Sequence, residues 1–234
     1  MDRIEIAQAA LNAKNGGNYL EIGVCTGTSF IPLQATRKWG VDPAHSLSWK
    51  RIAKYNLLDL LNVKREKIFR KTSDDFFKTH SRMLKRHGID VSFIDGLHTY
   101  EQALRDVINC LKYLKPKGLV LMHDCNPTDE IAAFPAAGIE EVAAMKIPGW
   151  SGGWNGDVWK AIVHLRSLRD DLNVFVLDCD NGIGVVSRER ASERLAYSEQ
   201  QIRKMDYTFL ESNRKHLLGL RSPESFFGFL KGQS

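Results

Sequence analysis

The stretch Tyr19-Leu-Glu-Ile-Gly-Val-Cys-Thr-Gly-Thr-Ser-Phe30 decides the fold of this 234-residue chain. It begins with an apolar run that ends at Gly23, and two glycines with small hydroxyl residues follow. A buried strand that passes through a glycine-containing turn into a helix is typical of the first unit of a doubly wound sheet. The stretch therefore predicts a first strand at 19–23 and a helix at about 29–38.

The rest of the chain alternates short apolar runs with helical patterns, which is typical of a mainly parallel sheet. The pair Asn181-Gly182 predicts a hairpin, so that one of the last two strands is antiparallel. We predict an α/β fold: a doubly wound Rossmann-like seven-stranded sheet, mostly parallel with a C-terminal antiparallel hairpin. It forms a single domain over 1–234, with a helical extension from about residue 190. Further strands are expected at 39–42, 67–70, 89–95, 118–123, 173–177 and 182–186, and helices at 49–61, through 76–84, at 99–114 and at 157–168.

Composition is that of a soluble enzyme, with 43% hydrophobic and 26% charged residues. No apolar run approaches the roughly 18 residues of a membrane span, and the amino terminus lacks the core of a signal peptide. The four cysteines are scattered, which favours reduced thiols in a cytoplasmic protein. The net charge of +5 is dispersed and favours solvated surface over nucleic-acid binding. The apolar stretch Phe226–Leu230 is expected to pack on the domain or on a second subunit, which leaves a homo-oligomer open.

The loop after the first strand excludes two common ligand motifs. A dinucleotide fingerprint needs glycine where Cys25 stands, and a phosphate loop needs lysine where Thr28 stands. Glu21, just before the first glycine, suits a cationic amino-acid cofactor better than a pyrophosphate. Loop amides near the helix start can face that cofactor's carboxylate. A plain strand-to-helix turn remains the alternative, and the candidate cofactor residues here are Glu21, Gly23, Thr26, Gly27 and Ser29.

Two further positions fit the nucleoside part of such a cofactor. Asp42 ends the second strand, where an acidic side chain can accept hydrogen bonds from ribose hydroxyls. Ser73 and Asp74 follow the third strand and are expected beside the adenine. A turn role for Asp42 and a helix-capping role for the Ser73 segment are the alternatives.

The sequence resembles a known family through four motifs, which are Glu21-x-Gly23-x-x-x-Gly27, Val41-Asp42-Pro43, Phe93-Ile-Asp95-Gly-Leu-His98-Thr-Tyr100 and Leu121-Met-His123-Asp124. These motifs resemble small class I S-adenosylmethionine-dependent O-methyltransferases, above all bacterial natural-product and sugar enzymes. The resemblance covers about residues 15–125, together with the block Trp154–Lys160. It implies an S-adenosylmethionine cofactor, His98 as general base, and Asp95 and Asp124 as ligands of a divalent metal such as Mg²⁺.

The residues themselves agree with this chemistry. Asp95 and Asp124 end the fourth and fifth strands, so we expect both carboxylates at one sheet edge, where Asp95 can also contact the cofactor. Mg²⁺ is commonly held by one or two carboxylates. The His98 imidazole titrates near neutrality and can take the proton of an attacking hydroxyl. A helix-start capping role for His98 is the alternative.

The acceptor is expected to be a hydroxyl of a sugar, glycoside or related natural product. Trp150, Trp154, Asp157, Trp159 and Lys160 are candidates for its wall, because aromatic faces pack on sugar rings, and His123 is a candidate substrate residue. Helix core for Trp159 and surface for Lys160 are the alternatives. Two other functions remain open: a catechol-type phenol O-methyltransferase, and a non-catalytic cofactor-binding partner subunit.

Overall fold

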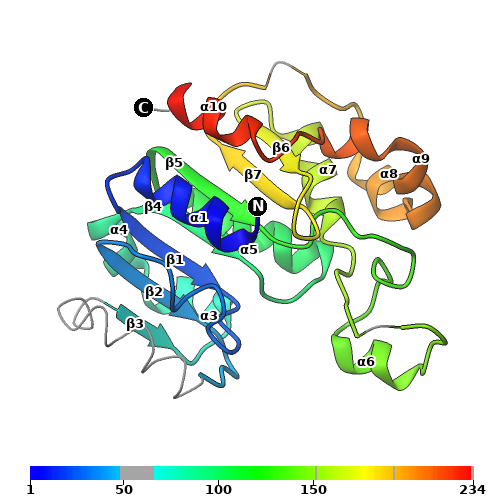
Figure 1. Ribbon diagram of the computed structural model, residues 1–234, viewed down its shortest axis with the longest axis horizontal. Coiled ribbons are helices and arrows are strands. Elements are labelled where there is room, and N and C mark those ends of the chain that lie inside the picture. The colour runs from blue at the N-terminus through cyan, green and yellow to red at the C-terminus, as the bar shows by residue number, and fades with distance from the viewer. Residues whose placement is uncertain (48–65, 151, 192, 233–234) are drawn as a thin grey trace. The chain divides into compact units, whose positions relative to one another are not determined.

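The computed structural model describes residues 1–47, 66–150, 152–191 and 193–232 (Figure 1). The strands of its sheet have the order β3-β2-β1-β4-β5-β7-β6. β1 is parallel to both β2 and β4, whereas β6 and β7 are antiparallel. The predicted fold class is therefore confirmed. The strand bounds are β1 Asn18–Ile22, β2 Arg37–Val41, β3 Glu66–Phe69, β4 Ile89–Ile94, β5 Leu114–Met122, β6 Asn173–Leu177 and β7 Ile183–Ser187.

The chain forms two compact units. The first comprises Met1–Gly96, Asp106–Leu121 and Phe227–Ser234, and the second comprises Leu97–Arg105 and Met122–Phe226. In the first unit, every residue of β1 is buried, as expected for a central strand of a parallel sheet covered on both faces.

The helix α1 (Arg3–Asn12) is an addition to the predicted elements, and it packs against β4. Asp2 and Glu5 form a capping box at its start: the Asp2 side chain accepts from the Glu5 backbone amide, and the Glu5 side chain accepts from the Asp2 backbone amide. Its apolar residues, which include Ile6 and Leu11, are buried. The spacing of Asp2 and Glu5 is a sequence signal that could have located this helix.

The helix predicted at about 29–38 is wrong. Residues 25–32 form turns, and β2 already begins at Arg37. Cys25 and Gly27 have left-handed backbone angles (φ 48° and 78°), and Pro32 has no N–H for a helical hydrogen bond. The Lys38 ammonium donates to the carbonyls of Phe30 and Ile31 (3.1 and 3.2 Å) and so holds the turns against β2. The helix predicted at 49–61 lies outside the described residues.

Other boundaries move by a few residues. The helix expected through 76–84 is two helices, α3 (Ser73–Thr79) and α4 (Ser81–His87). The helix α5 spans Tyr100–Tyr113, and β5 starts directly after it, four residues before the expected Gly118.

In the second unit, α7 (Trp159–Leu168) packs on β6 and contacts α8 (Glu199–Lys204) and α9 (Tyr207–Leu218) (Figure 1). Between β5 and α7, the described residues include the short helix α6 (Ile139–Ala144). Near the carboxyl end, α10 (Ser225–Gly232) buries Phe226 and Leu230.

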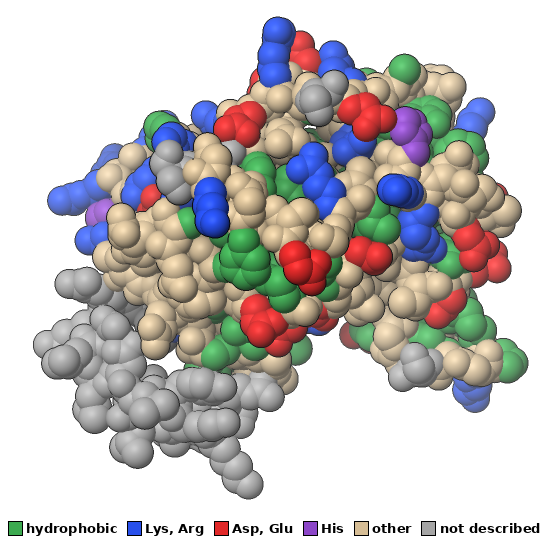
Figure 2. Space-filling model, turned by 45° about the horizontal axis from the view of Figure 1, so that its top comes forward, with side chains coloured by type: hydrophobic (Ala, Val, Ile, Leu, Met, Phe, Trp, Pro, Cys, Tyr) green, Lys and Arg blue, Asp and Glu red, His purple; other side chains and the backbone are tan. Residues whose placement is uncertain are grey.

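Charged side chains of both signs are interspersed on the face drawn in Figure 2, which agrees with the dispersed charge of the sequence. Among the described residues, no helix combines the length and the apolar character that crossing a membrane requires.

Candidate active site

The turn after β1 depends on glycine at its first position. Gly23 has φ +90°, and its N–H donates to the Val41 carbonyl (2.9 Å). A Cβ at this position would overlap the carbonyl of Asp95, so the two strand ends approach each other as closely as backbone allows. Gly23 is therefore required both by its conformation and by the space around it.

Asp42 fixes the next part of this turn. One carboxylate oxygen accepts from the Cys25 amide and the other from the Ala44 amide (both 2.7 Å). The Cys25 carbonyl in turn accepts from the Ser46 amide (2.9 Å). Asp42 thus joins the turn after β1 to the turn after β2, and each of its oxygens keeps a second lone pair for a ligand hydroxyl.

Glu21 lies beneath the turn and is fully buried. Tyr19 Oη donates to one of its oxygens (2.5 Å) and Ser29 Oγ to the other (2.7 Å). Burial raises the pKa of Glu21 to about 8, although both hydrogen bonds act in the opposite direction. Below that pH the side chain is neutral, so its contribution is to hold Ser29 in place rather than to supply charge.

The remaining cofactor candidates lie in the turn after β1 and at the start of α3, in the same unit. Thr26 and Thr28 face each other at 3.1 Å between their hydroxyl oxygens. Ser73, which is buried, and the exposed Asp74 occupy the first turn of α3. The cap of this helix is Thr72, whose hydroxyl accepts from the Asp75 amide (3.2 Å).

Asp95, at the end of β4, has a partner that the sequence analysis missed. Arg3 Nη1 on α1 donates to Asp95 Oδ2 at 3.0 Å, and the two side chains are 27% and 17% exposed. The two residues are far apart in sequence, and no motif marks Arg3 as part of a site. Its role follows only from the packing of α1 on β4.

Asp124, in the second unit, is surrounded by side-chain nitrogen atoms. Its backbone is left-handed (φ 60°), and its Oδ1 accepts from Asn155 Nδ2 (2.5 Å). Its Oδ2 lies 3.3 Å from His98 Nε2 and 3.0 Å from His123 Nδ1. Asn155 is a second site residue that sequence reasoning missed, although it lies in the quoted Trp154–Lys160 block.

His98 is held in one orientation by Trp154. Its Nδ1 lies 2.7 Å from the Trp154 carbonyl oxygen, and the two rings stack at 5.4 Å. Because a carbonyl oxygen only accepts, Nδ1 carries the proton, and Nε2 is the basic nitrogen of the neutral ring. Trp154 is itself fixed, since its Nε1 donates to the Phe134 carbonyl (2.7 Å).

His123 connects this cluster to the β6–β7 hairpin. It is 3% exposed, and its Nε2 lies 3.4 Å from Asp180 Oδ1. The backbone secures the same junction, because the Cys125 amide donates to the Gly182 carbonyl (3.0 Å). The second unit therefore brings together His98, His123 and Asp124, which the sequence analysis singled out separately.

The other acceptor candidates have structural partners. Asp157 Oδ1 accepts from the Tyr100 amide at the start of α5 (2.6 Å), and its Oδ2 lies 3.6 Å from Lys160 Nζ. Trp159 is 1% exposed. Trp150 lines a cavity of about 250 Å³ together with Asn155.

The predicted carboxylate pair is divided between the units, with Asp95 in the first and Asp124 in the second. The pairing of these two carboxylates on a metal stays a prediction. The cofactor candidates, in contrast, are all in the first unit, where Glu21, Ser29 and Asp42 support one turn.

Comparisons with known proteins find a matching family model and similar solved structures. Residues 20–125 match the family model for a methyltransferase domain. None of the curated proteins compared with the chain matches it. Among similar solved structures is a provisionally assigned O-methyltransferase from Klebsiella pneumoniae, 16% identical, with a TM-score of 0.53 and 81% of each chain covered. A second is the O-methyltransferase TomG from Streptomyces achromogenes, which is involved in tomaymycin synthesis and was solved in complex with SAM. TomG is 14% identical to this chain, with a TM-score of 0.52 and 81% of each chain covered. At these identities the likeness shows the fold alone.

Proposed function

We propose that this protein is a class I S-adenosylmethionine-dependent O-methyltransferase, a proposal supported by the match of residues 20–125 to the family model for a methyltransferase domain. Its acceptor in this proposal is a hydroxyl of a sugar, glycoside or related natural product. The observation that carries the proposal is the orientation of His98, whose Nδ1 is bonded to the Trp154 carbonyl so that Nε2 remains as a base.

The first unit binds the cofactor in this proposal. Amides of the turn at Gly23–Gly27 face the methionine carboxylate, with Thr26 beside them. Asp42 accepts hydrogen bonds from the ribose, and Ser73 and Asp74 lie at the adenine. Glu21 and Ser29 act from beneath the turn, which is supported by their mutual hydrogen bond (2.7 Å). Asp95 adds a carboxylate at the end of β4, held there by Arg3.

The second unit supplies the base. The acceptor oxygen bonds to the methyl carbon as the bond between sulfur and methyl breaks, and the hydroxyl proton passes to His98 Nε2. Asp124 stabilises the resulting imidazolium, and its distance of 3.3 Å from Nε2 supports this role. A positioned general base contributes about 10²–10⁴-fold to the rate.

The aromatic surroundings of His98 favour a ring-shaped acceptor. Trp154 stacks on His98, and Trp150 lines the cavity next to Asn155. Asp157 and Trp159 belong to the same segment and are proposed to support this wall. A catechol-type phenol acceptor is the second candidate, favoured by the aromatic character of the same residues.

We keep Mg²⁺ as part of the proposal, with Asp95 and Asp124 as ligands. The donor set fits, since carboxylate oxygens are the ligands that Mg²⁺ prefers and each carboxylate oxygen has more than one lone pair. When bound, the ion would lower the pKa of the acceptor hydroxyl.

The test begins with calorimetric titration of S-adenosylhomocysteine into the protein, which is expected to bind. Methyl transfer is then measured on sugar and catechol panels, each with and without EDTA. Transfer to sugars that EDTA abolishes and Mg²⁺ restores is the expected result. If EDTA does not change the rate of transfer, only the proposed role of Mg²⁺ is refuted. Cofactor binding without any transfer would favour a non-catalytic partner subunit. Absence of cofactor binding would refute the proposal.

A further inference from the structure

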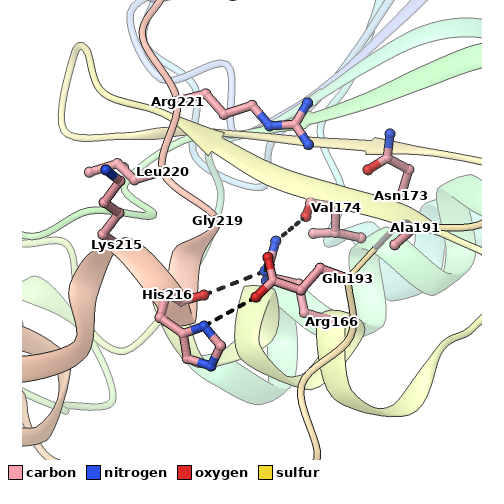
Figure 3. Close-up of a pocket in the computed structure, with 10 residues that line it drawn as sticks. All are labelled: Arg166, Asn173, Val174, Ala191, Glu193, Lys215, His216, Gly219, Leu220 and Arg221. Carbon is pink, nitrogen blue, oxygen red and sulfur yellow. Dashed lines mark hydrogen bonds and ion pairs between the residues drawn. The ribbon is translucent and has the colours of Figure 1, made fainter.

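We propose that the second unit contains an anion site for a phosphate-bearing small molecule, built from α7, α9 and β6 (Figure 3). The cavity has a volume of about 390 Å³, which is in the range of small-molecule pockets. It shares no residue with the cluster of His98, His123 and Asp124. The residues that line it are Arg166, Asn173, Val174, Ala191, Glu193, Lys215, His216, Gly219, Leu220 and Arg221.

Arg166 is a buried cation with little charge compensation. Its side chain is 6% exposed, and its Nη1 and Nη2 donate to the carbonyls of Val174 (2.7 Å) and His216 (3.4 Å). Its Nε is buried without a hydrogen-bond partner among the described residues. A buried guanidinium with neutral acceptors is costly unless an anion neutralises it. Burial also lowers the pKa of Arg166, which agrees with this account.

Glu193 is the one carboxylate among the described lining residues, and it is a weak partner. Its side chain is 63% exposed and lies 3.9 Å from Arg166 Nη2. Its other oxygen lies 3.3 Å from His216 Nδ1, and Figure 3 shows the three side chains together. The Glu193 carboxylate thus occupies the position where we expect a ligand anion to bind. A ligand would compete with this carboxylate for Arg166 and His216.

Two further cations complete the lining. Lys215 at the end of α9 and Arg221 after it are exposed residues of the lining, and the Arg221 guanidinium lies over the Phe175 ring, 3.9 Å from its centroid. Arg221 is anchored through its backbone, which donates to the Val176 carbonyl (2.8 Å). With Arg166, three permanent cations and a single carboxylate are among the described residues that line the cavity. That excess favours a dianion, and guanidinium groups match phosphate oxygens well.

The fold leaves space for this arrangement at one glycine. Gly219 ends α9 with a left-handed backbone (φ 57°), and a Cβ there would collide with the guanidinium of Arg166. The Arg166 side chain therefore occupies space that only glycine provides. This observation is independent of the charge count and supports a constructed site rather than a chance cluster.

The experiment titrates inorganic phosphate into the protein by calorimetry at low ionic strength, with glucose 1-phosphate, sulfate and acetate as parallel ligands. We expect saturable phosphate binding, sulfate binding of similar strength, and no acetate binding. If glucose 1-phosphate binds more tightly than inorganic phosphate, the ligand is an organic phosphate. If inorganic phosphate binds more tightly than glucose 1-phosphate, the ligand is the free ion. Absence of phosphate binding, or equal binding of acetate, would overturn the proposal.

Variants locate the binding in this cavity. The double variant K215Q/R221Q should bind phosphate about tenfold more weakly or worse, since it removes two charged donors. The control K85Q/R86Q removes two exposed cations from α4 and should bind like wild type. E193Q should bind several-fold more tightly because the competing carboxylate is gone. Unchanged affinity in K215Q/R221Q would refute the site. S-adenosylhomocysteine binding should be the same in all of these proteins, which separates this proposal from the proposed function.

Discussion

The turn after β1 and the segment after β5 both follow strands whose last residues are buried, but different groups shape them. The turn is set by backbone: Gly23 allows a close approach, and Asp42 accepts from loop amides. The segment after β5 is set by side chains, since Asp124 is surrounded by His98, His123 and Asn155. The comparison indicates that the candidate cofactor turn depends on close backbone approach, whereas the cluster around His98 depends on contacts between side chains.

The largest effect is expected for a substitution in the turn after β1. Gly23→Ala places a Cβ against the Asp95 carbonyl at a backbone angle that L-residues rarely adopt, so we expect a loss of more than ~3 kcal/mol in the free energy of unfolding. Urea denaturation measures this change. Gly228→Ala is the matched control, because that glycine lies in α10 with open space around it and should be neutral or slightly stabilising. Equal stability of the two variants would contradict the account of the turn.

The next effect concerns the side-chain cluster. His98→Ala should lower turnover by about 10²–10⁴-fold while S-adenosylhomocysteine affinity stays unchanged, because the base is removed and the turn after β1 is intact. Methyl-transfer kinetics and calorimetry provide the two measurements. His87→Ala on α4 is the control. Near-normal turnover of His98→Ala would retire the general-base role.

A smaller effect is expected at Asn155, which donates to Asp124 Oδ1. Hydrogen bonds to charged groups contribute about 1.5–3 kcal/mol, so Asn155→Ala should reduce turnover roughly tenfold by loosening the Asp124 carboxylate. As a positioning residue it should also shift the pH profile of turnover, since Asp124 faces His98. A change in stability alone, with an unaltered pH profile, would assign Asn155 a merely structural role. Asn213→Ala on α9 serves as the control.

The last effect is a pH dependence of stability. The pKa of Glu21 is raised from 4.5 to about 8 in the folded protein, mainly by burial. The folded state therefore binds this proton more tightly than the unfolded state, and its contribution to stability falls as the pH rises between those two values. Glu21→Gln keeps a hydrogen-bonding side chain without the ionisation, so its denaturation midpoint should vary less with pH than that of wild type. Parallel pH curves for the two proteins would contradict the raised pKa.

Sequence patterns located the sheet because strand length, glycines and the Asn181-Gly182 pair are local signals. They failed at 29–38, where left-handed residues and Pro32 override the apparent helix. In the candidate site, His98, His123 and Asp124 were recognised from motifs. Arg3 and Asn155 were not, because their contacts depend on packing between segments that no spacing connects.

The left-handed turn at Cys25 also has a practical consequence. All four cysteines lie in the described ranges, and Cys25 is exposed while Cys110 and Cys125 are buried and Cys179 is intermediate. A thiol-directed reagent should therefore label the turn first. Because the Cys25 amide is bonded to Asp42, a ligand in this turn would cover the thiol. The rate of alkylation would then report cofactor occupancy on the native chain, without any substitution or knowledge of the acceptor.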